Sequence, residues 1–256
     1  MKGKGILILM GYDYVHAIED LVETENTFVL ITKNNTQYIR PNNLAKLQTI
    51  MGDRLLISTQ SAIDIEGLVA SGRYNTLLTL GWRKLLDVNK FDALDRLVNV
   101  HPALLPEYKG YHPIPFVLLN QEANHGITAH EITNEMDSGA IILRREIAFT
   151  PFSTLPSLQY LVNQEMPNFI KELFALIRSE DIELKPNNDK DTVVRAPKRT
   201  PEDSEVRLED TVAEMFLKVK ASDANRFPAY FIINGEKVNI RLYRDEDADR
   251  QTKFDI

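Results

Sequence analysis

The chain has 256 residues, a length that allows one domain with a complete hydrophobic core or a large domain with a small appendage. Hydrophobic residues make up 43% and charged residues 26%, proportions typical of a globular domain. The net charge of −7 argues against a protein that grips nucleic acid over a large surface, because phosphate binding depends on clustered Lys and Arg. The absence of cysteine excludes a disulfide framework, a thiol nucleophile and a thiolate metal site, and it favours a cytoplasmic location.

The first residues, 1–4, carry charges and precede an apolar run at residues 5–10, an order that also occurs in signal peptides. Here the apolar run is short and ends at Gly11, with no small-residue cleavage site after it. We therefore predict a buried first strand. No apolar run approaches the roughly 18 residues that a membrane-spanning helix needs, so we expect no membrane contact.

The first half of the chain alternates short apolar runs with amphipathic stretches. The runs predict strands, and the stretches between them predict helices at residues 14–23, 43–51 and 62–71; the strands lie at 6–10, 28–32, 55–58 and 76–80. This alternation predicts βαβ units around a mostly parallel sheet. A further strand at 97–100 carries Asn99 and brings His101 to its carboxyl end, where ligands bind in open parallel sheets.

The second half contains fewer parallel units. The pattern predicts a helix at 114–121, strands at 127–132 and 140–147, and a long helix at 154–179 that Pro167 kinks or splits. A polar stretch at 180–191 predicts a boundary between a larger domain, residues 1–185, and a small α+β domain, residues 186–256. The small domain is expected to hold a short helix at 208–220 and a hairpin whose turn is Asn234-Gly235.

Three side chains form the strongest candidate for catalysis. Alternation along the predicted strand places Asn99 and His101 on one face, and Asp137 follows in a later loop. An amide, an imidazole and a carboxylate suit acyl transfer to an amine: the amide donates to a developing oxyanion, the imidazole donates or carries the proton, and the carboxylate pairs with the imidazole.

Each of these residues also has an ordinary structural interpretation. A histidine before proline at a strand end is often structural, and Asp137-Ser-Gly139 is a turn sequence. His112 and His130 could join His101 and Asp137 at a metal, but their spacings match no zinc pattern, so we predict no metal site. The occurrence of all three residues in one α/β chain favours the catalytic interpretation.

Residues 99–110, 126–130 and 136–142 together resemble the core signature of folate-dependent formyltransferases. That family includes glycinamide ribonucleotide transformylase, methionyl-tRNA formyltransferase and the nucleotide-sugar N-formyltransferases, and the resemblance covers about residues 75–180. It implies a Rossmann-like formyltransferase domain that uses N10-formyltetrahydrofolate, with Asn99, His101 and Asp137 as catalytic residues. It also implies a cis peptide bond at Leu105-Pro106, which proline makes energetically accessible.

The resemblance further implies where the folate lies. It would contact the loop after the fourth strand and the loop before the aspartate, and the corresponding residues here are Leu80, Gly81, Trp82, Leu85, Leu86, Ile132, Asn134 and Asp137.

Within the family, three features favour the sugar N-formyltransferases. Residues 10–14 lack the Gly-Ser-rich phosphate loop of the ribonucleotide enzymes. The segment after the predicted boundary is shorter than the C-terminal barrel that the tRNA enzymes carry on a basic linker, and the chain is acidic. Residues 198–204 and 226–231, with Asn234-Gly235, resemble the tail of the sugar enzymes, although the Gly of their usual Pro-Gly-Ala is absent. We expect formyl transfer to the primary amine of an amino-deoxy sugar on a nucleoside diphosphate.

The acceptor would then be held by cations and aromatic rings. Phe227 and Tyr230 are candidates for a platform under the base, with packing of the hairpin as the alternative, and Arg83 and Lys84 are candidates for the diphosphate. The resemblance adds three residues of the catalytic loop, Tyr108, Lys109 and Gly110.

The expected partners are a nucleotide-linked amino sugar and a second copy of the chain, which would pair through the apolar hairpin. We expect neither nucleic acid nor membrane as a partner, and a pathway such as bacterial surface-polysaccharide assembly. The alternatives are formyl transfer to a ribonucleotide or an aminoacyl-tRNA, hydrolysis of the folate, and a non-catalytic ligand-binding module on the same scaffold.

Overall fold

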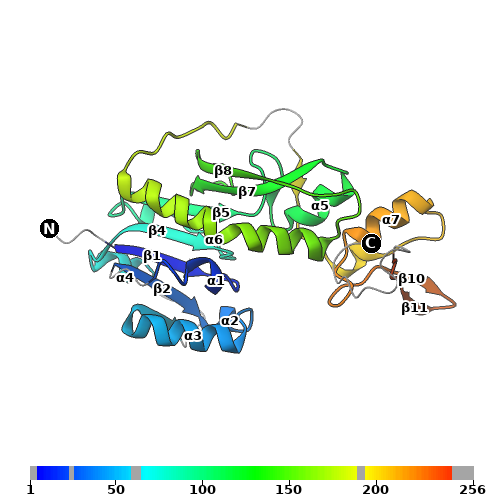
Figure 1. The fold of residues 1–256 in the computed structure, drawn as a ribbon, viewed down its shortest axis with the longest axis horizontal. Coiled ribbons are helices and arrows are strands. Elements are labelled where there is room, and N and C mark those ends of the chain that lie inside the picture. Colours follow the sequence, from blue (N-terminus) through cyan, green and yellow to red (C-terminus); the bar gives the residue numbers. More distant parts are fainter. Residues whose placement is uncertain (1–4, 23–25, 59–64, 189–193, 244–256) are drawn as a thin grey trace. The chain divides into compact units, whose positions relative to one another are not determined.

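The computed structural model describes residues 5–22, 26–58, 65–188 and 194–243 (Figure 1). Tertiary contacts group the chain into two compact units. Unit 1 comprises residues 1–101, 127–144 and 165–188, and unit 2 comprises residues 102–126, 145–164 and 189–256. The boundary predicted at residue 185 concerns which segment folds independently, and it stays a prediction.

The large sheet has seven strands in the order β3-β2-β1-β4-β5-β7-β8, and most of its residues belong to unit 1. The strands are β1 Gly5–Met10, β2 Thr27–Thr32, β3 Leu55–Ser58, β4 Tyr74–Leu80, β5 Arg96–His101, β7 Asn124–Glu131 and β8 Ile141–Ala148. β1 to β5 pair in parallel, and β7 pairs antiparallel to β5. The predicted α/β class with a mostly parallel sheet is confirmed, and each predicted strand lies within three residues of an observed one.

The central strands form because their sequences are apolar throughout. All six residues of β1 are buried, as expected for a parallel strand that is covered on both faces. A cluster of buried side chains on one face contains Leu7, Leu77 and Phe91, and the rings of Phe28 and Tyr74 meet edge to face nearby at 5.1 Å between centroids. Trp82, which follows β4, packs against the same cluster.

Short helices lie between these strands in the chain order of unit 1. They are α1 Val15–Ile18, α2 Lys33–Thr36, α3 Pro41–Met51 and α4 Ile65–Ala70, with 3-10 turns η1 Gly52–Arg54 and η2 Val88–Lys90. α1 is shorter than predicted because the chain continues from Ile18 in a tighter turn, with the Leu21 amide donating to the Ile18 carbonyl at 2.8 Å. Residue 23 and residues 62–64, the remaining parts of two predicted helices, lie outside the described residues.

The long helix α6, Leu155–Ser179, is continuous through Pro167, so of the two effects predicted for this proline, a kink or a split, the split does not occur. Its apolar stripe buries Phe169, Leu173 and Phe174 almost completely, and this burial favours continuation of the helix despite the missing proline N–H. No helix in the described part of the chain is long and apolar enough to cross a membrane.

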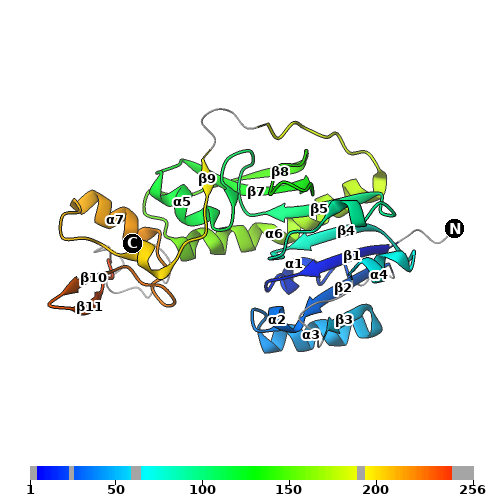
Figure 2. The same ribbon diagram turned by 180° about the vertical axis from the view of Figure 1, so that it is seen from behind.

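The described residues of unit 2 include the first part of α6, the helices α5 Pro113–Leu119 and α7 Val212–Lys220, a 3-10 turn η3 Pro201–Ser204, and two small sheets (Figure 2). One sheet is the parallel pair β6 Lys109–Gly110 and β9 Arg195–Ala196, and the other is the hairpin of β10 Tyr230–Ile233 and β11 Glu236–Asn239. Asn234 and Gly235 have φ values of 52° and 82°, which confirms the predicted turn.

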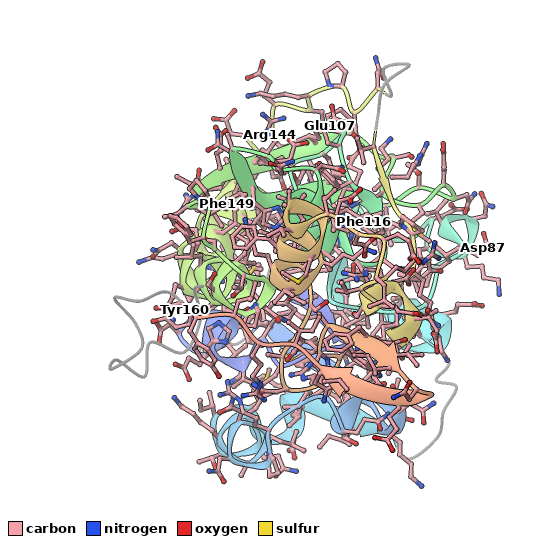
Figure 3. The ribbon with its side chains drawn as sticks, turned by 90° about the vertical axis from the view of Figure 1, so that its right-hand side faces the viewer. Asp87, Glu107, Phe116, Arg144, Phe149 and Tyr160 are labelled. Atoms are coloured by element: carbon pink, nitrogen blue, oxygen red, sulfur yellow. The ribbon has the colours of Figure 1, made fainter. Side chains whose placement is uncertain are left out.

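The core of unit 2 gathers around α5. Val117 and Leu118 are buried, and Phe116 and Phe149 pack against their cluster from the side (Figure 3). The Leu105-Pro106 peptide bond is cis, as predicted.

Candidate active site

The register of the sheet brings three polar side chains into one row across neighbouring strands. Thr79 on β4 lies opposite Asn99 on β5, and Asn99 lies opposite His130 on β7. Residues that oppose one another in this way share a face of the sheet, so their side chains can meet. The row lies near the carboxyl end of β5, where the sequence analysis placed the site.

The Asn99 amide contacts both of its neighbours in this row, Thr79 and His130, and also Asp137. Its Oδ1 accepts a hydrogen bond from the Thr79 hydroxyl at 2.7 Å. Its Nδ2 lies 3.0 Å from Nε2 of His130 and donates to Oδ1 of Asp137 at 3.3 Å. Nδ1 of His130 lies 2.7 Å from the Glu131 carbonyl oxygen and donates to it, so Nε2 is free to act as the acceptor from Asn99.

The Asp137 carboxylate lies between two imidazoles. Its Oδ2 is 3.6 Å from Nδ1 of His101, and its Oδ1 is 3.4 Å from Nε2 of His130. The His101 side chain is 6% exposed and that of Asp137 is 10% exposed. Limited contact with water strengthens the attraction between the carboxylate and a protonated His101. Asp137 can therefore keep a proton on His101 or receive one from a group beside it.

A second set of contacts fixes the loop that carries Asp137. Asp137 has a φ of 51°, in the left-handed region, and Gly139 is packed so closely that a Cβ there would lie 1.9 Å from the Glu131 carbonyl oxygen. Nδ2 of Asn187 donates to the carbonyl oxygens of Asp137 at 2.9 Å and of Gly139 at 2.8 Å. The buried Asn187 side chain thus holds the carboxylate loop in its turn.

The structure brings together the three predicted catalytic residues, and it adds Thr79, His130 and Asn187, which the sequence analysis missed. His130 was considered there only as a metal ligand. In the described residues no group of three or more acidic or histidine side chains is arranged to hold a metal ion, and His130 instead contacts Asn99 and Glu131.

The two loops predicted to contact folate are tied together. Oδ1 of Asn134 accepts a hydrogen bond from the Val88 amide at 3.2 Å, and Leu86 and Ile132 pack against the same apolar cluster. Leu85 projects outward and is 68% exposed. At the start of the first loop, after the buried end of β4 at Leu80, Gly81 has a φ of 63°.

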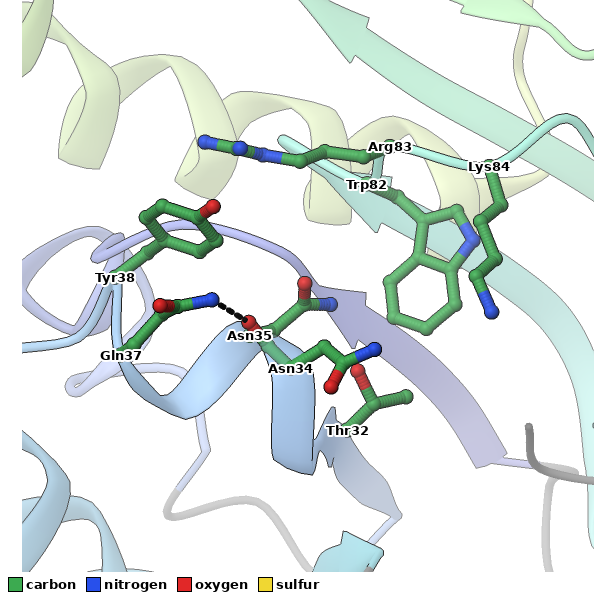
Figure 4. Close-up of a pocket in the computed structure, with 8 residues that line it drawn as sticks. All are labelled: Thr32, Asn34, Asn35, Gln37, Tyr38, Trp82, Arg83 and Lys84. Atoms are coloured by element: carbon green, nitrogen blue, oxygen red, sulfur yellow. Dashed lines mark hydrogen bonds between the residues drawn. The ribbon is translucent and has the colours of Figure 1, made fainter. Parts of the chain in front are cut away.

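A pocket of about 360 Å³ adjoins this loop (Figure 4). It lies at the carboxyl end of β2 and after β4, at the edge of the sheet where doubly wound folds bind ligands. The Arg83 guanidinium lies 3.8 Å from the centre of the Tyr38 ring, in a cation–π contact. The lining has two cations and no carboxylate; it consists of Thr32, Asn34, Asn35, Gln37, Tyr38, Trp82, Arg83 and Lys84.

Three of the residues predicted to contact the acceptor have structural contacts within unit 2. The Tyr108 hydroxyl donates to Glu122 at 2.5 Å, and burial together with this carboxylate raises the pKa of Tyr108 above its usual value. Lys109 is only 3% exposed, and a Cβ on Gly110 would lie 2.2 Å from the Ala196 carbonyl oxygen. These contacts place the segment beside β9, and its role toward a substrate stays a prediction.

The two predicted aromatic residues differ in exposure. Phe227 is 54% exposed, whereas Tyr230 is 6% exposed and its ring centre lies 3.6 Å from Nζ of Lys237. Tyr230 is thus buried beside Lys237 of β11, whereas Phe227 presents its ring to solvent, and the role of either ring toward a base stays a prediction.

Comparison with known proteins agrees with this geometry. A methionyl-tRNA formyltransferase of Thermotoga maritima is 31% identical over 175 residues, which are 68% of this chain and 54% of that protein. The chain spans about half the length of the curated relatives it matches.

Two solved structures share the fold over nearly the whole chain. A sugar N-formyltransferase from Shewanella sp. FDAARGOS_354 superposes with a TM-score of 0.73 at 20% identity, covering 93% of this chain and 97% of that one. An N-formyltransferase from Helicobacter canadensis, solved with folinic acid and dTDP-3-aminofucose, gives a TM-score of 0.74 at 19% identity, covering 92% and 86%.

The family model described as formyl transferase matches residues 35–172, a segment that contains Asn99, His101 and Asp137. This match spans more than half of the chain, and the chain therefore belongs to the formyl transferase family.

Proposed function

We propose that the protein transfers a formyl group from N10-formyltetrahydrofolate to the primary amine of a nucleoside-diphosphate-linked amino-deoxy sugar. One observation carries this proposal: Asn99, His101 and Asp137 converge in one partly buried cluster, in a chain of the formyl transferase family. That cluster has the hydrogen-bond donors and the proton acceptor that acyl transfer to an amine requires.

The two loops beside the cluster fit a folate. The exposed Leu85 offers an apolar contact for a flat ring system, and the bond between Asn134 and Val88 holds the second loop against the first. When bound there, N10-formyltetrahydrofolate supplies an activated one-carbon acyl group. The Helicobacter canadensis relative was solved with folinic acid, which supports a folate as the donor.

Each of the three catalytic side chains would have a different role, as a hydrogen-bond donor or as a proton acceptor. Nδ2 of Asn99 donates a hydrogen bond to the formyl oxygen as negative charge develops on it. His101, paired with Asp137 at 3.6 Å, donates to the same charge or would deliver a proton to N10 of the folate, so that tetrahydrofolate leaves as the bond from N10 to the formyl carbon breaks. The attacking amine must arrive unprotonated, and Asp137, directly or through a water, accepts the proton that its nitrogen loses.

Arg83 and Lys84 are our candidates for the diphosphate of the acceptor. Their pocket lacks a carboxylate, and its amide side chains and guanidinium are suited to phosphate oxygens (Figure 4). The exposed ring of Phe227 is a candidate for contact with the base. The dTDP-3-aminofucose in the Helicobacter canadensis structure supports an acceptor of this class. The cytoplasm, and assembly of surface polysaccharide, remain our expected setting.

A second candidate function is formyl transfer to methionyl-tRNA, which the name and 31% identity of the Thermotoga maritima relative favour. The net charge of −7 argues against it, because a tRNA is held mainly through its phosphates by Lys and Arg.

The deciding experiment is a turnover assay read by product mass. N10-formyltetrahydrofolate is mixed with a panel of amino-deoxy sugars on thymidine, uridine and guanosine diphosphates, and separately with charged initiator tRNA. We expect one sugar to gain one formyl group, with His101→Ala abolishing the gain and His16→Ala, a histidine on α1, as the matched control.

Asn99→Ala should lower kcat by about 10²- to 10³-fold, the usual loss for an oxyanion donor. Formylation of the tRNA but of no sugar would contradict the proposed acceptor and support formyl transfer to methionyl-tRNA instead. A loss of only two-fold in Asn99→Ala would contradict the role given to Asn99.

A further inference from the structure

We propose that Thr79 is a positioning residue that fixes which end of the Asn99 amide faces the reacting groups. This inference rests on the proposed function, because it assigns Thr79 an effect on formyl transfer. Thr79 lies on β4 directly opposite Asn99, is 2% exposed, and donates its hydroxyl proton to Oδ1 of Asn99 at 2.7 Å. Its other acceptor, the Val98 carbonyl oxygen, is more distant at 3.4 Å.

An asparagine amide has an acceptor on one side and two donors on the other, so its partners determine its orientation. Here the three partners agree. Thr79 can donate to the oxygen, whereas Asp137 and Nε2 of His130 accept from the nitrogen at 3.3 and 3.0 Å. A reversed amide would place Oδ1 against a carboxylate and an imidazole lone pair, and would repel both.

This orientation decides what Asn99 can offer to a substrate. The N–H groups that bind Asp137 and His130 are the donors that the formyl oxygen needs as it becomes negative. An amide whose oxygen is held by Thr79 presents only N–H groups on that side. Without the hydroxyl, Oδ1 of the partly buried Asn99 side chain would lose this hydrogen bond, and the amide could rotate about its terminal bond to form another.

The test compares two substitutions of nearly equal size. Thr79→Val keeps the shape and removes the hydroxyl, and Thr79→Ser keeps the hydroxyl. We expect Thr79→Val to lower kcat about 5- to 10-fold, the effect of one hydrogen bond, with both KM values unchanged within about two-fold. Thr79→Ser should retain kcat within about two-fold of the wild-type value.

A positioning role also requires that the effect depend on Asn99. In an Asn99→Ala background, adding Thr79→Val should change the residual kcat by less than about two-fold, because the group that Thr79 orients is gone. The same 5- to 10-fold fall in that background would overturn the proposal and assign Thr79 a general structural role. Unchanged kcat in Thr79→Val alone, or failure of Thr79→Ser to rescue, would also overturn it.

A spectroscopic measurement separates this proposal from the proposed function. The side-chain amide signals of Asn99 are identified by NMR through their loss in Asn99→Ala, and their positions are compared in the Val and Ser variants. We expect the two proton signals to move toward each other or broaden in Thr79→Val and to keep their positions in Thr79→Ser. If the wild type formylates no sugar, the proposed acceptor fails, while unchanged Asn99 signals in Thr79→Val would refute the positioning role.

Discussion

At the scale of single residues, the polar side chains of the site form hydrogen bonds to one another, which offset the cost of removing them from water. Thr79, Asn99 and His130 lie inside a sheet where an unsatisfied donor or acceptor would be costly, yet each finds its partner on the next strand. The arrangement leaves Asn99 with both of its N–H groups already engaged. A bound formyl oxygen would therefore compete with Asp137 or His130 for a donor on Asn99.

Outside the site, the buried carboxylate of Asp13 joins the segment after β1 to the start of α3. It accepts hydrogen bonds from Nε of Arg40 at 2.7 Å and from Nδ2 of Asn43 at 2.9 Å. Burial alone would raise the pKa of Asp13, but the hydrogen bonds from the Arg40 guanidinium, the Asn43 amide and the Arg40 backbone outweigh it and hold the pKa below its ordinary value of 3.8.

This lowered pKa predicts a pH-dependent contribution to stability. A carboxyl whose folded pKa lies below its unfolded one stabilises the fold fully above the unfolded pKa, and loses that contribution as the pH falls through the folded pKa. Asp13→Ala should therefore lower the free energy of unfolding by about 2 kcal/mol at pH 7, and by less at a pH of about 3, below the ordinary pKa of 3.8. Urea unfolding at both pH values measures this, with the exposed Asp92→Ala as control; an equal loss at both would contradict the linkage.

The sequence identified a site residue where a local pattern, such as alternation along a strand, was enough to place its side chain. Asn99 and His101 could be placed because strand alternation gives them one face. Thr79 and His130 could not, since each looks like an ordinary strand residue until the register is known. Asn187 was read as part of a polar boundary, because the carbonyl groups that it binds belong to a turn some 50 positions earlier.

At the scale of elements, regular strands were predictable and irregular connections were not. Continuous apolar runs gave the strand positions, whereas α2 has only four residues and no periodicity to detect. The parallel pair β6 and β9 has two residues in each strand and depends on segments far apart in the sequence. The effect of Pro167 depended on how strongly the rest of α6 is buried, which the local sequence does not show.

The hydrogen bond between the two loops predicted to contact folate gives a prediction at the scale of an element. Asn134→Ala removes the acceptor for the Val88 amide and should loosen the second loop against the first. We expect the KM for N10-formyltetrahydrofolate to rise about three- to ten-fold, corresponding to one hydrogen bond, while kcat stays within about two-fold. Steady-state kinetics with the folate varied tests this, and Asn75→Ala at the start of β4 is the matched control. A fall in kcat with unchanged KM would place Asn134 in the chemical step instead.

At the scale of the whole molecule, the chain enters unit 2 in three separate segments. A sequence pattern compares residues that are near one another along the chain. It can therefore indicate a domain boundary at one position, but not a unit assembled from several separate segments. The exposed apolar residues of the hairpin, in contrast, were visible in the sequence: Ile232, Ile233 and Val238 are 47%, 46% and 41% exposed.

We infer from this surface that two copies of the chain associate through the hairpin. Among the described residues, β10 and β11 form a two-stranded sheet, and β10 has one further bridge, between Tyr230 and Glu205. Ribbons this small gain stability when another surface covers them. Phe231 and Val238 are opposite one another, and Ile233 shares their face, so one side of the ribbon is largely apolar.

This association predicts how single substitutions change the molar mass in solution. Val238→Lys places a charge in the centre of the apolar face. Burying this charge against a second copy would cost more free energy than the apolar contact contributes. We expect a dimer for the wild type and a monomer for Val238→Lys by light scattering, because the interface would lose its core. Leu208→Lys, at a residue 77% exposed that lies outside the hairpin, should leave the dimer intact. Dimers that persist in Val238→Lys would place the interface elsewhere, and a monomeric wild type would mean that the apolar face serves another contact.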